Sequence, residues 1–153
     1  MIVTVHPLLL RTAFCGLLSL SLSPVLFAQA CQTMPYLHQN KFDPHPLELA
    51  RVRGRAVDEN GMAVAQLCIG IFSEPDHKLL RYAQSGENGK FNVDTNGLAD
   101  GEYRLVGYIP GFCPANAILN ISSNSHSQHK RALVIRMNLP GTADCSDVQL
   151  SKK

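Results

Sequence analysis

Hydrophobic and polar residues alternate along most of the chain from Leu49 onward, and Gly, Pro, Asn and Asp separate the apolar runs at regular intervals. A period of two is typical of β-strands with one buried face, and regularly spaced breaks are typical of an all-β sandwich. No segment predicts a helix longer than one turn. The pattern predicts seven strands, at residues 50–57, 63–72, 79–85, 90–94, 102–109, 113–121 and 131–139.

The alternation also predicts which side chains face the core. In the second predicted strand the inward set is Leu67, Ile69 and Ile71, which places Cys68 on the opposite face, because successive side chains of a strand point to opposite sides. In the seventh strand, Leu133, Ile135, Met137 and Leu139 alternate with Val134, Arg136 and Asn138.

The first thirty residues follow a different pattern. One fixed charge, Arg11, precedes a mostly apolar run that ends before Pro24, and the small residues Ala28 and Ala30 follow. The run is shorter than the roughly 20 residues that a membrane-spanning helix needs, and the small residues suit signal peptidase. Residues 1–30 are therefore predicted to be a signal peptide of a secreted or periplasmic protein. The alternative is an uncleaved membrane anchor.

Cleavage after Ala30 would leave Cys31 as the first residue, which also suggests lipoprotein processing and a lipid anchor at Cys31. Lipoprotein signals usually have Leu and a small residue three and two positions before that cysteine, where this chain has Ala28 and Gln29. The lipid anchor therefore stands as the alternative, and no membrane span is expected in the mature chain.

Four cysteines follow the predicted cleavage site, and an even number in an oxidising compartment predicts two disulfides. Three connectivities are possible, and the sequence does not choose among them. The pairing preferred here joins Cys31 to Cys145 and Cys68 to Cys113, which would tie both tails to the body of the domain.

Composition and charge fit one ordinary globular domain. The chain is 45% hydrophobic and 17% charged, with a formal net charge of +2, so no basic excess favours nucleic-acid binding. Residues 31–48 are rich in Pro, His and Gln without periodicity and are expected to form an N-terminal arm. The sandwich domain is expected at 49–150.

Four motifs, in order and at regular spacing, resemble the carboxypeptidase regulatory-like domain family. They lie at residues 52–64, 86–91, 98–105 and 110–112. This resemblance covers about residues 50 to 140 and implies a seven-stranded, transthyretin-like Greek-key β-sandwich. In zinc carboxypeptidases the domain is a non-catalytic companion of the enzyme, so the resemblance implies a binding role.

The residues of these motifs are also explained by structure alone. Glycines allow positive φ angles or close backbone approach, and large aromatic side chains anchor the two sheets. The residues in question are Gly54, Gly61, Gly89, Phe91, Gly101, Tyr103 and Gly111.

Two histidines in the polar loop before the seventh strand, His126 and His129, are the candidate metal ligands. Their imidazoles could share Zn²⁺ or Cu²⁺, with a third ligand from His77, His38 or His45. The ordinary interpretation is a solvated loop. A His-x-x-Glu spacing at residues 45–48 resembles part of a carboxypeptidase zinc site, but it lacks a third ligand and a catalytic scaffold.

Two classes of enzyme with related folds have characteristic residue sets. Intradiol dioxygenases hold iron with two Tyr and two His, and Tyr103, Tyr108, His126 and His129 are the right types, but the chain lacks their His-x-His pair. It also lacks the Tyr-Arg-Gly-Ser tail of transthyretin-like hydroxyisourate hydrolases. No catalytic residue and no cofactor are predicted, and the chain is expected not to be an enzyme.

The prediction is a secreted or periplasmic, non-enzymatic binding or interaction module whose partner is an unidentified extracytoplasmic protein or cell-envelope component. Its interface would be loops or an open sheet edge. The alternatives are a protein that binds a metal or a small ligand, including a carbohydrate, and a minor hydrolase. The absence of Trp weakens the carbohydrate alternative, because sugar-binding modules usually stack sugars on exposed aromatic rings.

Overall fold

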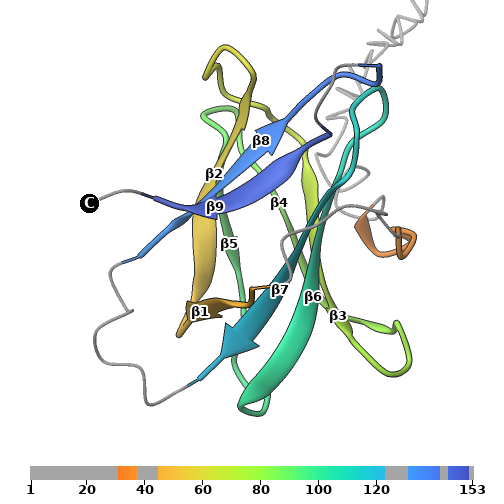
Figure 1. The fold of residues 1–153 in the computed structure, drawn as a ribbon, viewed down its shortest axis with the longest axis vertical. Helices are drawn as coiled ribbons and strands as arrows, with labels where there is room; N and C mark the ends of the chain where they lie inside the picture. Colours follow the sequence, from red (N-terminus) through yellow and green to blue (C-terminus); the bar gives the residue numbers. More distant parts are fainter. Residues whose placement is uncertain (1–30, 38–44, 123–130, 142–144, 152–153) are drawn as a thin grey trace, which may run out of the picture.

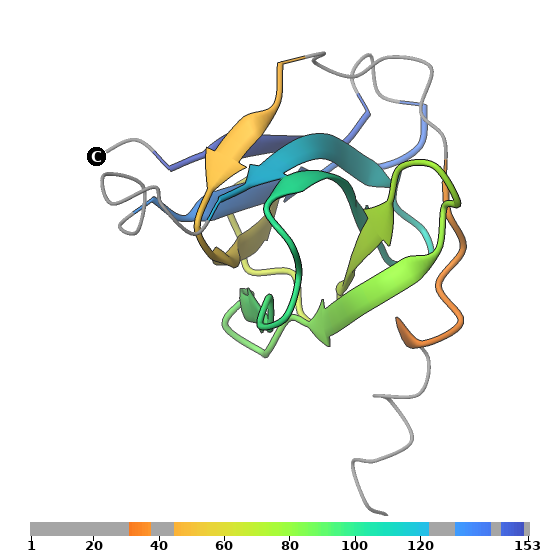
Figure 2. The same cartoon turned by 90° about the horizontal axis from the view of Figure 1, so that it is seen from below.

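The structure is a computed structural model that describes residues 31–37, 45–122, 131–141 and 145–151. These residues form nine strands and no α-helix. The strands build two mixed sheets that lie face to face, as the two views in Figures 1 and 2 show. The predicted all-β sandwich is thereby confirmed, with nine strands in place of seven. Within the described part of the chain, no helix is long and apolar enough to cross a membrane.

One layer is a five-stranded sheet with the order β1-β7-β6-β3-β4. Its β1 runs parallel to β7, and its other pairs are antiparallel. The strands span Leu47–Leu49 (β1), Cys68–Ser73 (β3), Leu79–Gln84 (β4), Gly101–Tyr108 (β6) and Ala115–Ile121 (β7).

The other layer is a four-stranded sheet with the order β5-β2-β8-β9. Here β2 runs parallel to β8, whereas β5 pairs with β2 and β9 pairs with β8 in antiparallel fashion. The strands span Val52–Asp58 (β2), Lys90–Val93 (β5), Leu133–Met137 (β8) and Asp147–Leu150 (β9).

The seven predicted strands correspond to β2 through β8, and the structure adds β1 and β9. Each added strand is only three or four residues long and forms by pairing with the edge of a sheet. The predicted start of the second strand at residue 63 is wrong, because β3 begins at Cys68. Gln66 adopts a positive φ of 61°, and Leu67 N–H donates to the Ser85 side chain instead of to a neighbouring strand.

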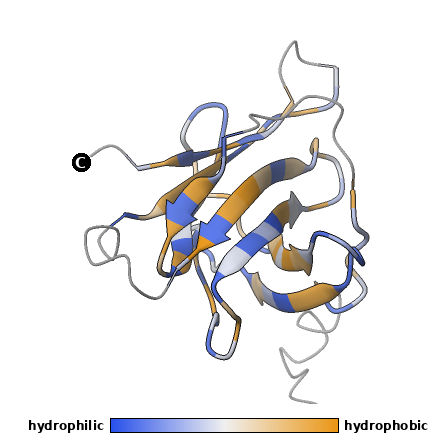
Figure 3. Cartoon of the chain, turned by 60° about the horizontal axis from the view of Figure 1, so that its bottom comes forward, coloured by the Kyte–Doolittle hydropathy of each residue, from blue (hydrophilic) through white to orange (hydrophobic). Residues whose placement is uncertain are grey.

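The main core lies between the sheets, and the alternation of hydrophobic and hydrophilic residues along the strands is visible in Figure 3. As predicted, Leu67, Ile69 and Ile71 belong to this core, whereas Cys68 lies on the opposite face of the sheet. The predicted end of the seventh strand at Leu139 is wrong, since β8 ends at Met137 and the Leu139 side chain is 49% exposed.

The tight turn after β2 has the geometry that its sequence favours. The Asp58 Oδ1 accepts hydrogen bonds from the backbone N–H groups of Asn60 and Met62, at 2.9 and 2.8 Å. Gly61 then adopts a φ of +81°, which side-chain-bearing residues rarely tolerate. The turn therefore returns the chain along β2, where Ala63 bridges Val57.

The disulfides differ from the preferred pairing, which is wrong. Cys31 is bonded to Cys68, and Cys113 is bonded to Cys145, with Cα–Cα distances of 5.3 and 5.4 Å. Cys68 faces outward from β3, where the N-terminal segment lies, and Ser146, next to Cys145, donates from its hydroxyl to the Cys113 carbonyl at 2.6 Å. Two disulfides are typical of extracytoplasmic proteins.

Residues 31–37 lie against the outer face of the five-stranded sheet, where they form a second apolar cluster. Cys31 and Met34 are buried there with Phe72 and Val106. Of the expected N-terminal arm, residues 31–37 cover this face, and Leu47 and Glu48 belong to β1.

Two predictions concern Cys31 and the residues before it, namely the lipid anchor and the signal peptide. A sulfur atom in a disulfide cannot also carry a thioether-linked lipid, so lipidation of Cys31 requires the bridge to Cys68 to be absent. The predicted signal peptide, residues 1–30, lies outside the described residues.

Candidate functional site

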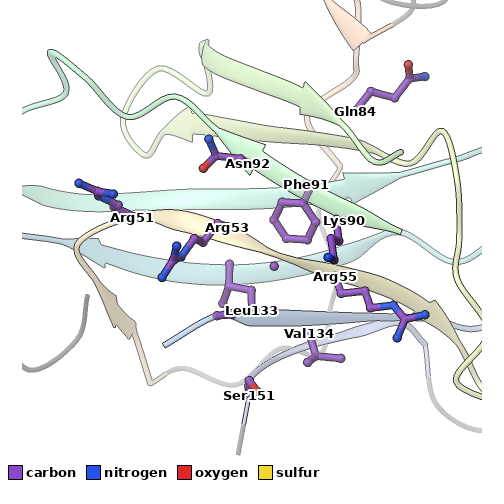
Figure 4. Close-up of a pocket in the computed structure, with 12 residues that line it drawn as sticks. Arg51, Arg53, Arg55, Gln84, Lys90, Phe91, Asn92, Leu133, Val134 and Ser151 are labelled. Carbon is purple, nitrogen blue, oxygen red and sulfur yellow. The ribbon is translucent and has the colours of Figure 1, made fainter. Parts of the chain in front are cut away.

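A groove of about 790 Å³ runs over the four-stranded sheet, and β2, β5 and β8 provide most of its walls (Figure 4). The groove is called the basic groove below, because its lining includes Arg51, Arg53, Arg55 and Lys90. No Asp or Glu is among its lining residues. A volume of this size lies within the range of about 300–1,000 Å³ that is common for ligand pockets.

Strand alternation places these cations on the outer face. On β2, Val52 and Ala56 belong to the core, so Arg53 and Arg55 between them point outward and are exposed. On β5, Phe91 faces inward and the exposed Lys90 faces outward. Four cations consequently gather on one face of a chain whose formal net charge is only +2.

Sheet register brings two of the cations directly opposite each other. Arg55 of β2 pairs with Lys90 of β5, and on the same two strands Arg53 pairs with Asn92. Side chains opposite each other in an antiparallel pair have Cβ atoms about 4.5–5.5 Å apart, and like charges at this spacing are destabilising. The groove therefore concentrates positive charge that an anionic ligand would neutralise.

The Arg55 guanidinium has a defined anchor. The Nε of Arg55 donates to the backbone carbonyl of Asn88 at 3.2 Å, in the turn before β5. This bond occupies one donor of the planar guanidinium, which has five, and leaves the terminal N–H groups available to a bidentate anion.

The floor of the groove is apolar and depends on a glycine. A Cβ at Gly54 would lie 2.1 Å from the Leu133 carbonyl oxygen, so only glycine lets β2 and β8 approach this closely. The floor is the apolar surface of Ala132 and Val134, which are half-buried, and Val134 lies on the outer face because it pairs with Arg55. Phe91 and Leu133 also line the groove, but they point into the core and are only 6% and 1% exposed. Asn92, Gln84 and Ser151 complete the lining.

The candidate metal ligands are not brought together by what the structure describes. His126 and His129 lie outside the described residues. The ring of His77 instead stacks on Tyr36, with centroids 4.0 Å apart. Among the residues that the structure places, no group of three or more His, Cys, Asp or Glu side chains has the geometry to hold a metal ion, and this includes His45 and Glu48.

The two tyrosines of the type that ligates iron in intradiol dioxygenases lie on opposite faces of a sheet. Tyr103 and Tyr108 both lie on β6, and their odd spacing of five places them on opposite faces. Tyr103 packs against the main core and donates its hydroxyl to the Ala99 carbonyl at 2.7 Å, whereas Tyr108 packs against the second cluster. They cannot ligate the same ion in this structure.

The residues of the four motifs occupy turns, strands and the core, as expected from their side chains. Phe91 is buried in the core, and Gly89 has a φ of +74° with the Ala56 carbonyl 2.4 Å from the place of a Cβ. The others lie in β2 (Gly54), the turn after β2 (Gly61), β6 (Gly101, Tyr103) and the turn after β6 (Gly111).

The basic groove was not predicted, although the sequence carries part of its signal. Arginines at 51, 53 and 55 occupy alternate positions, which on a strand means one face. The contribution of Lys90 has no such signal, because it depends on the register between β2 and β5.

Comparisons with known proteins add little. No protein-family model matches the sequence, and no curated protein matches it. Among solved structures, the chain is similar to 3-chlorocatechol 1,2-dioxygenase from Rhodococcus opacus 1CP, with 12% sequence identity and a TM-score of 0.36. The match covers 84% of this chain and 77% of that one.

The comparison corrects one prediction. The expectation that the chain is not an enzyme is contradicted, because a solved structure to which the chain is similar is itself an enzyme. At this identity and score, the similarity assigns no reaction to the chain.

Proposed function

We propose that this protein is an extracytoplasmic β-sandwich binding module of the carboxypeptidase regulatory-like type, and that the basic groove is its binding surface. The observation that carries the proposal is the groove itself, with its four cations and its apolar floor. Such a combination of a few charged groups around an apolar surface is common in ligand sites.

Location outside the cytoplasm is supported by two features of the chain. Residues 1–30 have the pattern of a secretory signal, and the two cysteine pairs lie at disulfide distance. The proposal covers both extracytoplasmic locations, secreted and periplasmic.

The transthyretin-like Greek-key topology is supported by the path of the chain between the layers. The chain changes sheet between β2 and β3, between β4 and β5, between β5 and β6, and between β7 and β8. Greek-key connections of this kind are usual in sandwiches of about this size. In this proposal, β1 and β9 are additions at the edges of the seven-stranded fold.

The basic groove favours a ligand that enters a cleft over a partner that lies on a flat surface. Its volume suits a small molecule or a few units of a polymer, and its lining offers hydrogen-bonding groups beside the charges. The small-ligand alternative is therefore included in the proposal, whereas the metal-binding alternative has no cluster among the described residues to support it.

Affinity capture with matched variants tests the proposal. The mature, oxidised protein is compared with Arg53→Gln/Arg55→Gln, which removes two groove cations, and with Lys78→Gln, which removes an exposed cation from the β3–β4 turn. We expect a component of the extracytoplasmic fraction to bind the unaltered protein and Lys78→Gln but not the groove variant. Equal capture by all three proteins would refute the groove as the binding surface.

A further inference from the structure

We propose that the basic groove binds a linear acidic polysaccharide of the polyuronate class, with carboxylates at the cations and sugar rings over the apolar floor. This inference rests on the proposed function, because it names the ligand class of the same groove. It is carried by the spacing of the cations, by their chemical type and by the composition of the floor.

The cations are spread along and across the strands. Arg53 and Arg55 are two residues apart on β2, which corresponds to about 6.6 Å along the strand. Lys90 lies across from Arg55, about 5 Å away at the level of the Cβ atoms. A small anion would contact one or two of these groups, whereas a chain with carboxylates at regular intervals can reach all of them.

Most of the groove cations are arginines. A guanidinium presents a planar fork of N–H donors that matches both oxygens of a carboxylate, whereas an ammonium acts as a compact point charge. Solubility alone would be served as well by lysine. Arginine at 51, 53 and 55 is therefore better suited to the recognition of oxyanions such as carboxylates.

The floor supplies what a sugar ring needs beside its charge. The half-buried Ala132 and Val134 offer apolar surface to the C–H face of a ring, and the Asn92 side chain offers a donor and an acceptor to its hydroxyl groups. Charge then supplies most of the affinity, so the absence of Trp is compatible with binding an acidic sugar polymer.

The concave shape argues against an anionic membrane surface as the ligand. A membrane would meet the exposed basic side chains, but a flat surface would not enter the groove and reach the half-buried Ala132 and Val134. Vesicles are therefore included in the experiment as a competing probe.

Isothermal titration calorimetry of the mature, oxidised chain tests the ligand class. The probes are polygalacturonate, alginate, methyl-esterified polygalacturonate, which has the same backbone without its charge, and phosphatidylglycerol vesicles. We expect both polyuronates to bind at low salt, and the esterified polymer to bind at least about tenfold more weakly, as the loss of one charge-assisted hydrogen bond would give. Added salt should weaken polyuronate binding, because the attraction between exposed charges is screened.

Variants connect the binding to the groove. Arg53→Gln/Arg55→Gln/Lys90→Gln should lose at least about tenfold in affinity for polygalacturonate, whereas the control Lys78→Gln should change it by less than about twofold. Far-UV circular dichroism and the unfolding transition show whether each variant is folded. Removing like charges that face each other should not unfold the sheet.

The outcomes separate the two proposals. If the polyuronates do not bind, or if the esterified polymer binds equally well, the ligand class is wrong while the groove can still pass the capture test. Binding to vesicles alone also overturns the polysaccharide. If polyuronates bind equally to the triple variant, the groove is not the site and the proposed function fails with it.

Discussion

Gly54 is the position at which one added methyl group should do the most damage to the four-stranded sheet. It lies in β2, with Phe91 opposite it on β5 and Leu133 opposite it on β8. In Gly54→Ala, the new Cβ would lie 2.1 Å from the carbonyl oxygen and 2.7 Å from the carbonyl carbon of Leu133. Both atoms belong to the backbone, so no side-chain rotation can relieve the clash.

The cost follows from how far the strands must move. Ordinary contacts between heavy atoms lie at about 3.5–4.0 Å, so β2 and β8 must separate locally by more than about 1 Å. Overpacking of this kind costs about 1–3 kcal/mol, and weakening one or two ladder hydrogen bonds adds about 1 kcal/mol each. We expect Gly54→Ala to lower the free energy of unfolding by about 3–5 kcal/mol.

Urea unfolding of the oxidised protein, followed by far-UV circular dichroism, measures this loss. The matched control is Gly86→Ala, where the nearest atom to a new Cβ is the Asn88 Oδ1 at 3.7 Å, an ordinary contact. The control should change the free energy of unfolding by less than about 0.5 kcal/mol. A loss below about 1 kcal/mol in Gly54→Ala would refute the reasoning, because the parallel β2–β8 pair would then tolerate a side chain at its first paired position.

Three further predictions concern a disulfide, a buried hydroxyl and the groove charges. Replacing Cys31 and Cys68 by Ala should lower the free energy of unfolding by about 3–4 kcal/mol, because the bridge closes a loop across 37 residues; a loss below about 1 kcal/mol, measured by urea unfolding, would contradict this. Ser85→Ala should cost about 1–3 kcal/mol in the same assay, since its hydroxyl donates to one buried backbone group and accepts from another; a neutral result would show that both groups find other partners. Lys90→Glu should raise the free energy of unfolding by about 0.2–1 kcal/mol, because it places opposite charges across from Arg55. The same variant should weaken polygalacturonate binding, and a less stable variant with intact binding would contradict the assignment of the groove.

The mature chain offers a direct check of its covalent structure. Mass spectrometry of peptides from the unreduced protein should recover Cys31 joined to Cys68 and Cys113 joined to Cys145. Recovery of Cys31 joined to Cys145 would contradict the fold of the N-terminal segment, because the disulfide between Cys31 and Cys68 attaches that segment to β3.

Local patterning determined most of the sandwich. The alternation of Leu67, Ile69 and Ile71 against Cys68 predicted both faces of β3, because side-chain direction in a strand depends only on position along it. Gly61 was likewise expected to allow a positive φ, and the structure confirms it at +81°, in a turn whose hydrogen bonds join neighbours in the sequence.

Elements that exist only through distant partners were missed or misplaced. β1 and β9 are too short to show a period, and they form because the edges of β7 and β8 offer unpaired backbone groups. The same reason explains the wrong disulfide pairing. The sequence shows how many cysteines there are, but Cys31 pairs with Cys68 because the N-terminal segment packs on the outer face of β3.

The sequence by itself determined an all-β chain with two disulfides and three arginines at alternate positions. Only the tertiary structure decided that these arginines lie beside Lys90 over a floor of Ala132 and Val134. The register between β2 and β5 and the close approach of β2 and β8 at Gly54 are long-range properties. They are fixed by packing between segments that are far apart in the chain, which no local pattern records.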